Sequence, residues 1–142
     1  MVRKAVVSIA CLALVGVIAC RANAAQQAAV QQATKAADDW LKLVDGGKYA
    51  ESWAESSTVF KDRLNADGWG KMVGPVRQPL GPVLSRKLKT AQYATSLPGA
   101  PDGQYVVIQY DTSFEKKKSA VETITPMLDK DGQWRVSGYY IK

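Results

Sequence analysis

Apolar side chains recur every three or four positions over the first part of the chain, which is the period of an amphipathic helix. Over residues 25–44 they fall on one helical face, and charged or amide side chains fill the opposite face. The apolar face consists of Val30, Ala33, Ala37, Trp40, Leu41 and Val44. The pattern predicts one long helix that ends at Gly46-Gly47, because glycine readily takes the left-handed conformation that closes a helix.

Shorter helical segments follow these glycines. A short second helix is predicted, with one or two further turns before Asn65, and its shared side consists of Tyr49, Ala50, Trp53 and Ala54. Asn65 is a predicted cap, because its side-chain oxygen can accept a hydrogen bond from the free amides at the start of a third helix. That helix carries on its apolar side Trp69, Met72, Val73 and Val76. Pro75 predicts that it kinks or ends there.

After Pro79-Leu80-Gly81-Pro82 the apolar period changes from helical to alternating, which is typical of half-buried strands. Four strands are predicted at residues 83–95, 106–114, 120–128 and 134–140. Lys116-Lys117-Lys118 forms a charged hairpin tip, and Pro126 marks a sheet edge or a bulge because it cannot donate to a ladder. Helices followed by an antiparallel meander predict an α+β fold in which one sheet face packs against the long helix.

Seven short motifs are distributed along the chain between Trp40 and Tyr139. They are Trp40-Leu41-x-Leu43-Val44-Asp45, Tyr49-x-x-Ser52-Trp53, Arg77-x-Pro79-Leu80-Gly81, Ser85-Arg86, Leu97-Pro98-Gly99-Ala100-Pro101-Asp102-Gly103, Glu122-Thr123 and Trp134-Arg135-Val136-x-Gly138-Tyr139. Together they are similar to the bacterial domain-of-unknown-function 4019 family, and the order of elements resembles the cystatin-like or nuclear-transport-factor-2-like (NTF2-like) architecture. The resemblance implies a long helix and two short helices on a curved four-stranded antiparallel sheet, and an exported location. It brings no established activity or catalytic residue, and Pro75 departs locally from the family pattern.

Residues 1–24 have the pattern of a bacterial export signal: Arg3 and Lys4, an apolar run at 5–19, and the small triplet Ala22-Asn23-Ala24. The triplet favours cleavage of this signal peptide after Ala24, which leaves a single periplasmic or secreted domain at 25–142. Val17-Ile18-Ala19-Cys20 also resembles a lipobox, and lipidation of Cys20 predicts instead a lipoprotein tethered to a bacterial membrane. The apolar run is short for a retained span, which needs about 20 residues.

Removal of this leader changes the chemistry of the chain. The net charge falls from +6 to +3, because Arg3, Lys4 and Arg21 leave with it and no acid does, so we expect no nucleic-acid partner. Both cysteines, Cys11 and Cys20, leave as well, and the remaining 118 residues are enough for one domain without a disulfide. The chain has no histidine, which removes the usual general base and the commonest metal ligand. We therefore expect no metal site and no cofactor.

Aromatic and arginine side chains are the candidates for ligand binding. A pocket between the helices and the concave sheet could be lined by Trp40, Tyr49, Trp53, Trp69, Tyr110 and Trp134. Core packing is the favoured role for these rings, since each buries roughly 150–250 Å² when enclosed. Arg77 and Arg86 flank a rigid turn and could clamp a carboxylate or phosphate. Pairing with acids on neighbouring elements is the favoured alternative for both.

These constraints favour an exported, non-enzymatic domain of the bacterial envelope that binds a small apolar molecule or a protein partner. One alternative is a small isomerase- or hydratase-like enzyme that uses Glu122 with Tyr110 on the adjacent strand; it requires a carboxylate in a cavity with a route to solvent. Another is a homodimer packed sheet to sheet, and membrane contact enters only if Cys20 is lipidated. The acids of the first helix are expected to be solvated, namely Asp38, Asp39 and Asp45.

Overall fold

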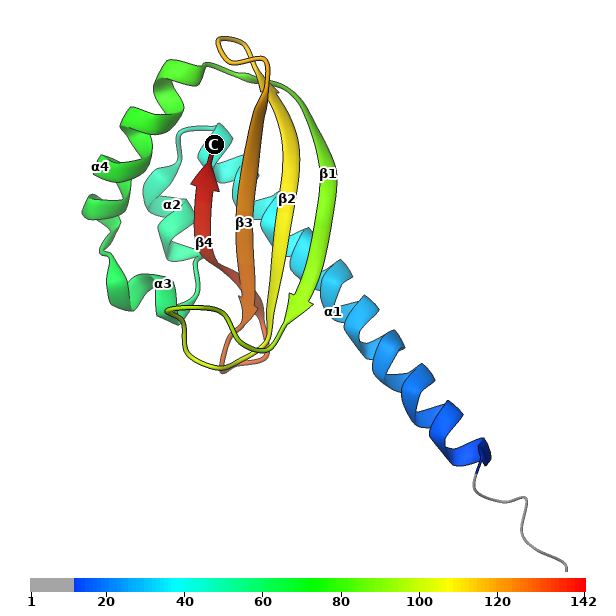
Figure 1. Cartoon of the computed structure of the whole chain (residues 1–142). Helices are drawn as coiled ribbons and strands as arrows, with labels where there is room; N and C mark the ends of the chain where they lie inside the picture. The colour runs from blue at the N-terminus through cyan, green and yellow to red at the C-terminus, as the bar shows by residue number, and fades with distance from the viewer. Residues whose placement is uncertain (1–11) are drawn as a thin grey trace, which may run out of the picture.

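A helical layer and an antiparallel sheet make up the molecule, and the computed structural model describes residues 12–142 (Figure 1). Helix α1 (Leu12–Asp45) is followed by α2 (Tyr49–Ala54), α3 (Thr58–Arg63), α4 (Ala66–Arg77) and the short 3-10 helix η1 (Gln78–Leu80). The sheet contains β1 (Val83–Ala94), β2 (Tyr105–Phe114), β3 (Ala120–Leu128) and β4 (Trp134–Ile141), which are antiparallel neighbours in chain order. The α+β prediction is confirmed. The charged start of the predicted leader, with Arg3 and Lys4, lies outside the described residues.

Helix α1 is longer than predicted and ends where predicted. It begins at Leu12 and continues through Ala24, and its N-terminal part projects beyond the sheet (Figure 1). At the other end Gly47 has a φ of 72°, its N–H donates to Val44, and the next N–H donates to the Leu43 carbonyl. These two bonds form a Schellman closure, which requires the left-handed conformation that glycine supplies.

The sheet buries one face against α1. In β2 the inward positions are the even-numbered ones, Val106, Ile108, Tyr110, Thr112 and Phe114, as the alternation predicted. Val106, Ile108 and Tyr110 form one core cluster with the apolar stripe of α1, whose buried members are Ala33, Ala37, Trp40, Leu41 and Val44. Pro126 lies in the central strand β3, at a shift of register against β4, so it marks a bulge and not an edge.

An aromatic cluster joins α1 to the short helices. The ring of Trp40 lies 5.7 Å from that of Trp69 and 5.3 Å from that of Tyr139, between ring centroids. Ser52 of α2 connects the two indoles, since its carbonyl accepts from Trp40 Nε1 at 2.8 Å and its hydroxyl accepts from Trp69 Nε1 at 2.9 Å. Satisfying both indole N–H groups allows these large rings to be buried without loss of hydrogen bonding.

Helix α4 is capped as predicted but buries a narrower face. The side chain of Asn65 accepts from Gly68 N at 2.8 Å. Of the apolar residues named for this helix, Trp69 and Val73 are buried, whereas Met72 and Val76 are 61% and 50% exposed. The helix also continues past Pro75 to Arg77. Gly74 and Arg77 are buried as well, so α4 packs on the body along one side that extends from Trp69 to Arg77.

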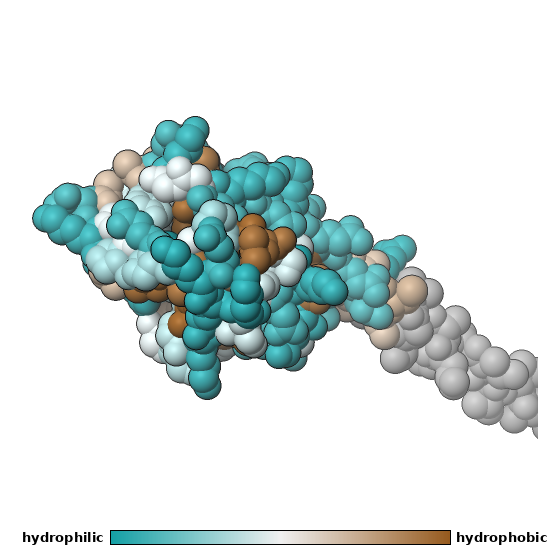
Figure 2. Space-filling view, turned by 90° about the horizontal axis from the view of Figure 1, so that it is seen from above, coloured by the Kyte–Doolittle hydropathy of each residue, from teal (hydrophilic) through white to brown (hydrophobic). Residues whose placement is uncertain are grey.

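Among the described side chains, 19–142, the large exposed apolar residues lie on three separate elements. Figure 2 shows one end of the molecule as mostly hydrophilic, with small apolar patches between charged and polar side chains. The large exposed apolar residues are divided among α4, β1 and β4: Met72, Val76, Leu84, Leu88 and Tyr140. Within residues 12–142, no helix combines the length and the apolar character needed to cross a membrane.

Candidate functional site

A fully buried carboxylate, Glu122 of β3, lies on the inner face of the sheet. Arg86 of β1 donates to it from Nε at 2.8 Å and from Nη2 at 3.2 Å. The hydroxyl groups of Thr112 and Tyr139 each donate to one of its oxygens at 2.6 Å. Glu122 is opposite Tyr110 in the strand register, so the predicted adjacency of these two residues is confirmed. Both carboxylate oxygens are occupied by donors from neighbouring strands.

A second carboxylate, Asp45 at the end of α1, is joined to Glu122 through Arg86. Arg86 Nη1 and Nη2 contact its two oxygens at 2.8 and 3.0 Å, and Arg77 Nη2 contacts it at 2.8 Å. Asp45 is exposed to solvent, as predicted, with its side chain 26% exposed, but it is also bound by two guanidinium groups, which the sequence did not predict. Arg77 and Arg86 thus pair with acids of neighbouring elements, which was the favoured alternative to an anion clamp.

The buried polar cluster consists of Asp45, Arg77, Arg86 and Glu122 and balances two positive and two negative charges. Arg77 and Glu122 are buried, Arg86 is partly buried, and Asp45 lies at the exposed edge of the cluster. Burial alone would lower the pKa of Arg86, but its hydrogen bonds to Asp45 and Glu122 outweigh that effect and raise it. The pKa of Tyr139 is raised by burial and by the negative charge of Glu122. Charge-assisted bonds of this kind are stronger than neutral ones. They hold the ends of α1 and α4 to the sheet.

Arg77 is the least satisfied member of the cluster. Its side chain is 5% exposed, and its guanidinium carbon lies 4.5 Å from the ring centroid of Phe114. Nε and Nη1 find no acceptor within residues 19–142. Both nitrogen atoms are buried, so they face the protein interior and not solvent.

The buried polar cluster is poorly arranged for acid-base catalysis. A general base must reach a substrate proton with a free oxygen, and the donors of Arg86, Thr112 and Tyr139 already occupy Glu122. Tyr110 donates its hydroxyl to Asp38 of α1 at 2.6 Å, and burial together with that bond raises its pKa. Glu122 and Tyr110 are neighbours, but the structure directs their polar groups to different partners.

The two tryptophans proposed as ligand contacts have structural partners. Trp40 is 3% exposed, and its Nε1 also donates to Ser56 Oγ at 3.0 Å. Trp53 is partly exposed, donates from Nε1 to the carbonyl of Leu64 at 2.6 Å, and carries Lys61 over its ring. Both rings connect helices to one another, so their main contacts are core contacts.

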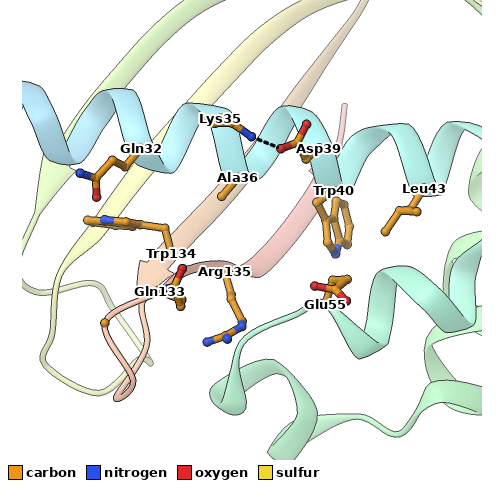
Figure 3. A pocket seen from close by; sticks show the side chains of 11 residues that line it. Gln32, Lys35, Ala36, Asp39, Trp40, Leu43, Glu55, Gln133, Trp134 and Arg135 are labelled. Atoms are coloured by element: carbon orange, nitrogen blue, oxygen red, sulfur yellow. Dashed lines mark hydrogen bonds and ion pairs between the residues drawn. The ribbon is translucent and has the colours of Figure 1, made fainter.

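An open groove runs between α1 and the start of β4 (Figure 3). It encloses about 660 Å³, with Gln32, Lys35, Asp39 and Leu43 on the α1 side and Gln133, Trp134 and Arg135 on the other. Glu55 lies at its lower wall, and the edge of Trp40 borders it. A second hollow of about 390 Å³ continues from it past α3 and shares Glu55 and Arg135. The two hollows, which share this wall, are together called the α1/β4 groove.

Several polar groups in the α1/β4 groove are not engaged by the protein. The indole N–H groups of Trp40, Trp53 and Trp69 each donate to an oxygen of the chain, while Trp134 Nε1 has no acceptor within residues 19–142. The amides of Gln32 and Gln133 and the carboxylate of Glu55 also point into the groove (Figure 3) and form no side-chain hydrogen bond there with described residues. These groups and the indole of Trp134 are available to a ligand.

The sequence predicted a pocket between the helices and the sheet with Trp40 and Trp134 among its lining residues, and both line this groove, but its polar lining was not predicted. Core packing was the favoured role for Trp134, and its ring is partly buried and packs against the core, while Gln32 and Glu55 were not among the predicted site residues. The available signal is weak: Trp134 directly follows the turn at Asp131-Gly132, where a large ring has less chain around it. Cys20, the candidate for lipidation, lies exposed on the projecting part of α1.

Comparison with known proteins gives a family and no activity. No curated protein matches the chain by sequence. The model of one family matches residues 36–139, which include the buried polar cluster, the aromatic cluster and most of the α1/β4 groove. The match covers most of the chain and extends from the middle of α1 to Tyr139 of the last strand. The chain therefore belongs to the DUF4019 family, a family of proteins of unknown function.

Proposed function

We propose that this protein is an exported domain of the bacterial envelope that acts by binding and not by catalysis, and that the α1/β4 groove is its binding site. The observation that carries the proposal is the set of unengaged groups around Trp134 in an open groove of about 660 Å³. That volume is within the range of about 300–1,000 Å³ typical of ligand sites. In the interior, by contrast, most polar side chains form hydrogen bonds with other groups of the chain.

Export is compatible with the packing of α1. Residues 19–28 are exposed, Ala29 and Val30 are the first to be partly buried, and Ala33 is the first buried residue of the described side chains. Of the residues that cleavage after Ala24 would remove, the described side chains, 19–24, are all exposed and belong to no part of the core. The tethered form would place about nine further helical residues, or roughly 13 Å of helix, between the lipid and the first packed side chain.

Binding is favoured over the isomerase- or hydratase-like alternative by the state of Glu122. An enzyme of that kind needs its carboxylate beside a substrate cavity. Glu122 lines neither part of the α1/β4 groove, nor the hollow of about 350 Å³ beside Arg77 and Asp45. A small apolar molecule is also disfavoured as ligand, because the groove is open and has charged and amide groups on both walls.

Intact-mass measurement of the protein purified from the cell envelope tests export. An unmodified chain beginning at Ala25 is expected. A diacylated chain beginning at Cys20 would show that the protein is tethered to a membrane through its lipid and that cleavage after Ala24 does not occur. A full-length chain found with the cytosolic fraction would overturn export altogether.

Binding is tested by titrating the 15N-labelled mature protein with three probes, dodecanoate, chitotetraose and a capped uncharged octapeptide. At least one probe is expected to shift the amide signals of Gln32, Gln133 and Arg135 and the indole signal of Trp134. The signals of Tyr140 and Thr123, on the other face of the sheet, serve as the internal control. If no probe at millimolar concentration moves the groove signals, the assignment of the groove as a binding site is wrong.

A further inference from the structure

The α1/β4 groove offers both an aromatic surface and groups that can donate and accept hydrogen bonds. Figure 3 places the indole of Trp134 beneath Gln32 of α1, with Gln133 and Arg135 beside it and Glu55 across the opening. The amides of Gln32 and Gln133 each present donors and an acceptor, Trp134 Nε1 donates, and Glu55 accepts. A ligand that fits must have an apolar surface for the ring and many small polar groups around it.

The charges of the groove cancel one another. On α1, Asp39 is held by Lys35 at 2.6 Å and by Lys42 at 2.8 Å, and these bonds lower its pKa to about 2. On the hairpin, Arg135 contacts Asp131 at 2.7 Å through both guanidinium nitrogens. The walls thus offer no surplus of positive charge for phosphate and no strong negative field for a cation. A neutral ligand suits these walls better than a polyanion or a basic peptide.

The edge of the sheet beside the groove is closed to an added strand. β4 is an edge strand, and a peptide bound as a further strand would have to pair with its outward backbone groups. The N–H of Ser57 already donates to the carbonyl of Val136 at 2.9 Å, two residues after Trp134. Strand addition is therefore blocked just where a peptide leaving the Trp134 region would continue.

We propose that the α1/β4 groove binds a neutral oligosaccharide, with Trp134 as the platform for one sugar ring. This inference rests on the proposed function and names its ligand class. One face of a pyranose ring is lined by C–H groups that pack on an indole, while its hydroxyl groups both donate and accept. Gln32 and Gln133 lie beside Trp134 and are placed to meet those hydroxyls, while Glu55 lies beneath Trp40, farther along the groove, where it can meet a neighbouring sugar (Figure 3). The continuation of the groove past Glu55 and Arg135 leaves room for neighbouring sugars.

Calorimetric and NMR titration of the mature protein with chitotetraose and cellotetraose tests the proposal. At least one of them is expected to bind, with the indole signal of Trp134 shifting most. Trp134→Ala is expected to weaken that binding about tenfold or more, as truncation of a central aromatic contact does. Gln32→Ala, at an exposed helical position where unfolding is not at issue, is expected to weaken it severalfold. Tyr140→Ala is the matched control, since Tyr140 is a 61% exposed aromatic outside the groove, and its affinity is expected to stay unchanged.

The outcomes separate this inference from the function on which it rests. If the octapeptide or dodecanoate shifts the groove signals and neither oligosaccharide does, the saccharide assignment is wrong and the binding function stands. If an oligosaccharide binds equally well to the wild type, Trp134→Ala and Gln32→Ala, it binds elsewhere and the assignment is also wrong. If no probe shifts the groove, both proposals fail.

Discussion

Removal of one member of the buried polar cluster is the most informative perturbation of this fold. Glu122 is fully buried and accepts four hydrogen bonds, two of them from Arg86, whose side chain is 16% exposed. Glu122→Leu leaves Arg86 buried with Asp45 alone and leaves the hydroxyls of Thr112 and Tyr139 without their acceptor. Breaking a buried pair from one side costs about 3–5 kcal/mol. Arg86→Leu leaves Glu122 with its hydroxyl donors, so we expect a loss near the lower end of that range.

The double variant Glu122→Leu/Arg86→Leu distinguishes a paired charge from two independent contacts. It removes both charges together, and Asp45 keeps its bond from Arg77. Replacing a whole buried pair by apolar residues is often close to neutral. We therefore expect the double variant to be more stable than the sum of the single losses predicts, by at least about 2 kcal/mol of coupling free energy.

Urea unfolding followed by tryptophan fluorescence measures the free energy of unfolding for all four proteins of this cycle. With an m-value of about 1.5 kcal/mol/M, a loss of about 3 kcal/mol lowers the unfolding midpoint by about 2 M. Glu122→Gln keeps the shape of the side chain and serves as a milder variant if Glu122→Leu does not fold. Single losses that add to within about 0.5 kcal/mol in the double variant would refute the pairing argument.

Three further predictions concern single residues. Tyr139→Phe is expected to lose less stability than the wild type as the pH rises above about 10. The raised pKa of Tyr139 keeps it protonated in the folded chain, while the unfolded chain ionises near pH 10. The wild type therefore loses stability as the pH rises from there, by up to about 1.4 kcal/mol per pH unit for this group. Urea midpoints at pH 9 and pH 11 measure the effect, and equal pH dependence in both proteins would contradict it. Gly70→Ala is expected to raise the free energy of unfolding by about 0.5–1 kcal/mol, because an added Cβ meets nothing within 4 Å. Gly68→Ala is expected to gain less stability or to lose some, because its Cβ would lie 2.9 Å from a Leu64 methyl. Thermal unfolding of both variants measures the difference, and a more stable Gly68→Ala would be incompatible with this packing. Asn65→Ala is expected to cost about 1 kcal/mol by removing the cap bond to Gly68, with Asn65→Asp as the control that keeps the acceptor.

Local patterns predicted those parts of the fold that depend on neighbours in sequence. The end of α1 at Gly47 follows from the conformational freedom of glycine, and the cap at Asn65 follows from an acceptor placed three residues before a free amide. The inward face of β2 follows from its alternation. The burial of α4 was predicted less well, because an apolar residue such as Met72 has no partner unless the tertiary structure brings one.

The candidate sites show the same division more sharply. The sequence indicated that Arg77 and Arg86 would pair with acids but could not say with which, since Asp45 and Glu122 lie far from them along the chain. Asp45 itself looked solvated, because nothing near it in sequence reveals two guanidinium groups above it. The α1/β4 groove is formed by α1, the α2 to α3 connection and β4, and no local pattern records that these three segments meet.

The sequence by itself determined the α+β order of elements, the helix ends and the inward face of the best-patterned strand, and it indicated a leader and a family. These properties depend on periodicity, on glycine and asparagine at helix ends, and on the presence or absence of particular residue types, all of which are local or compositional. The tertiary structure alone decided that Glu122 is enclosed by donors from three strands and that Trp134, which packs against the core, remains partly exposed in the groove. Whether a polar group is hydrogen-bonded within the chain or free to bind a ligand depends on which distant side chains contact it, and only folding brings those side chains together.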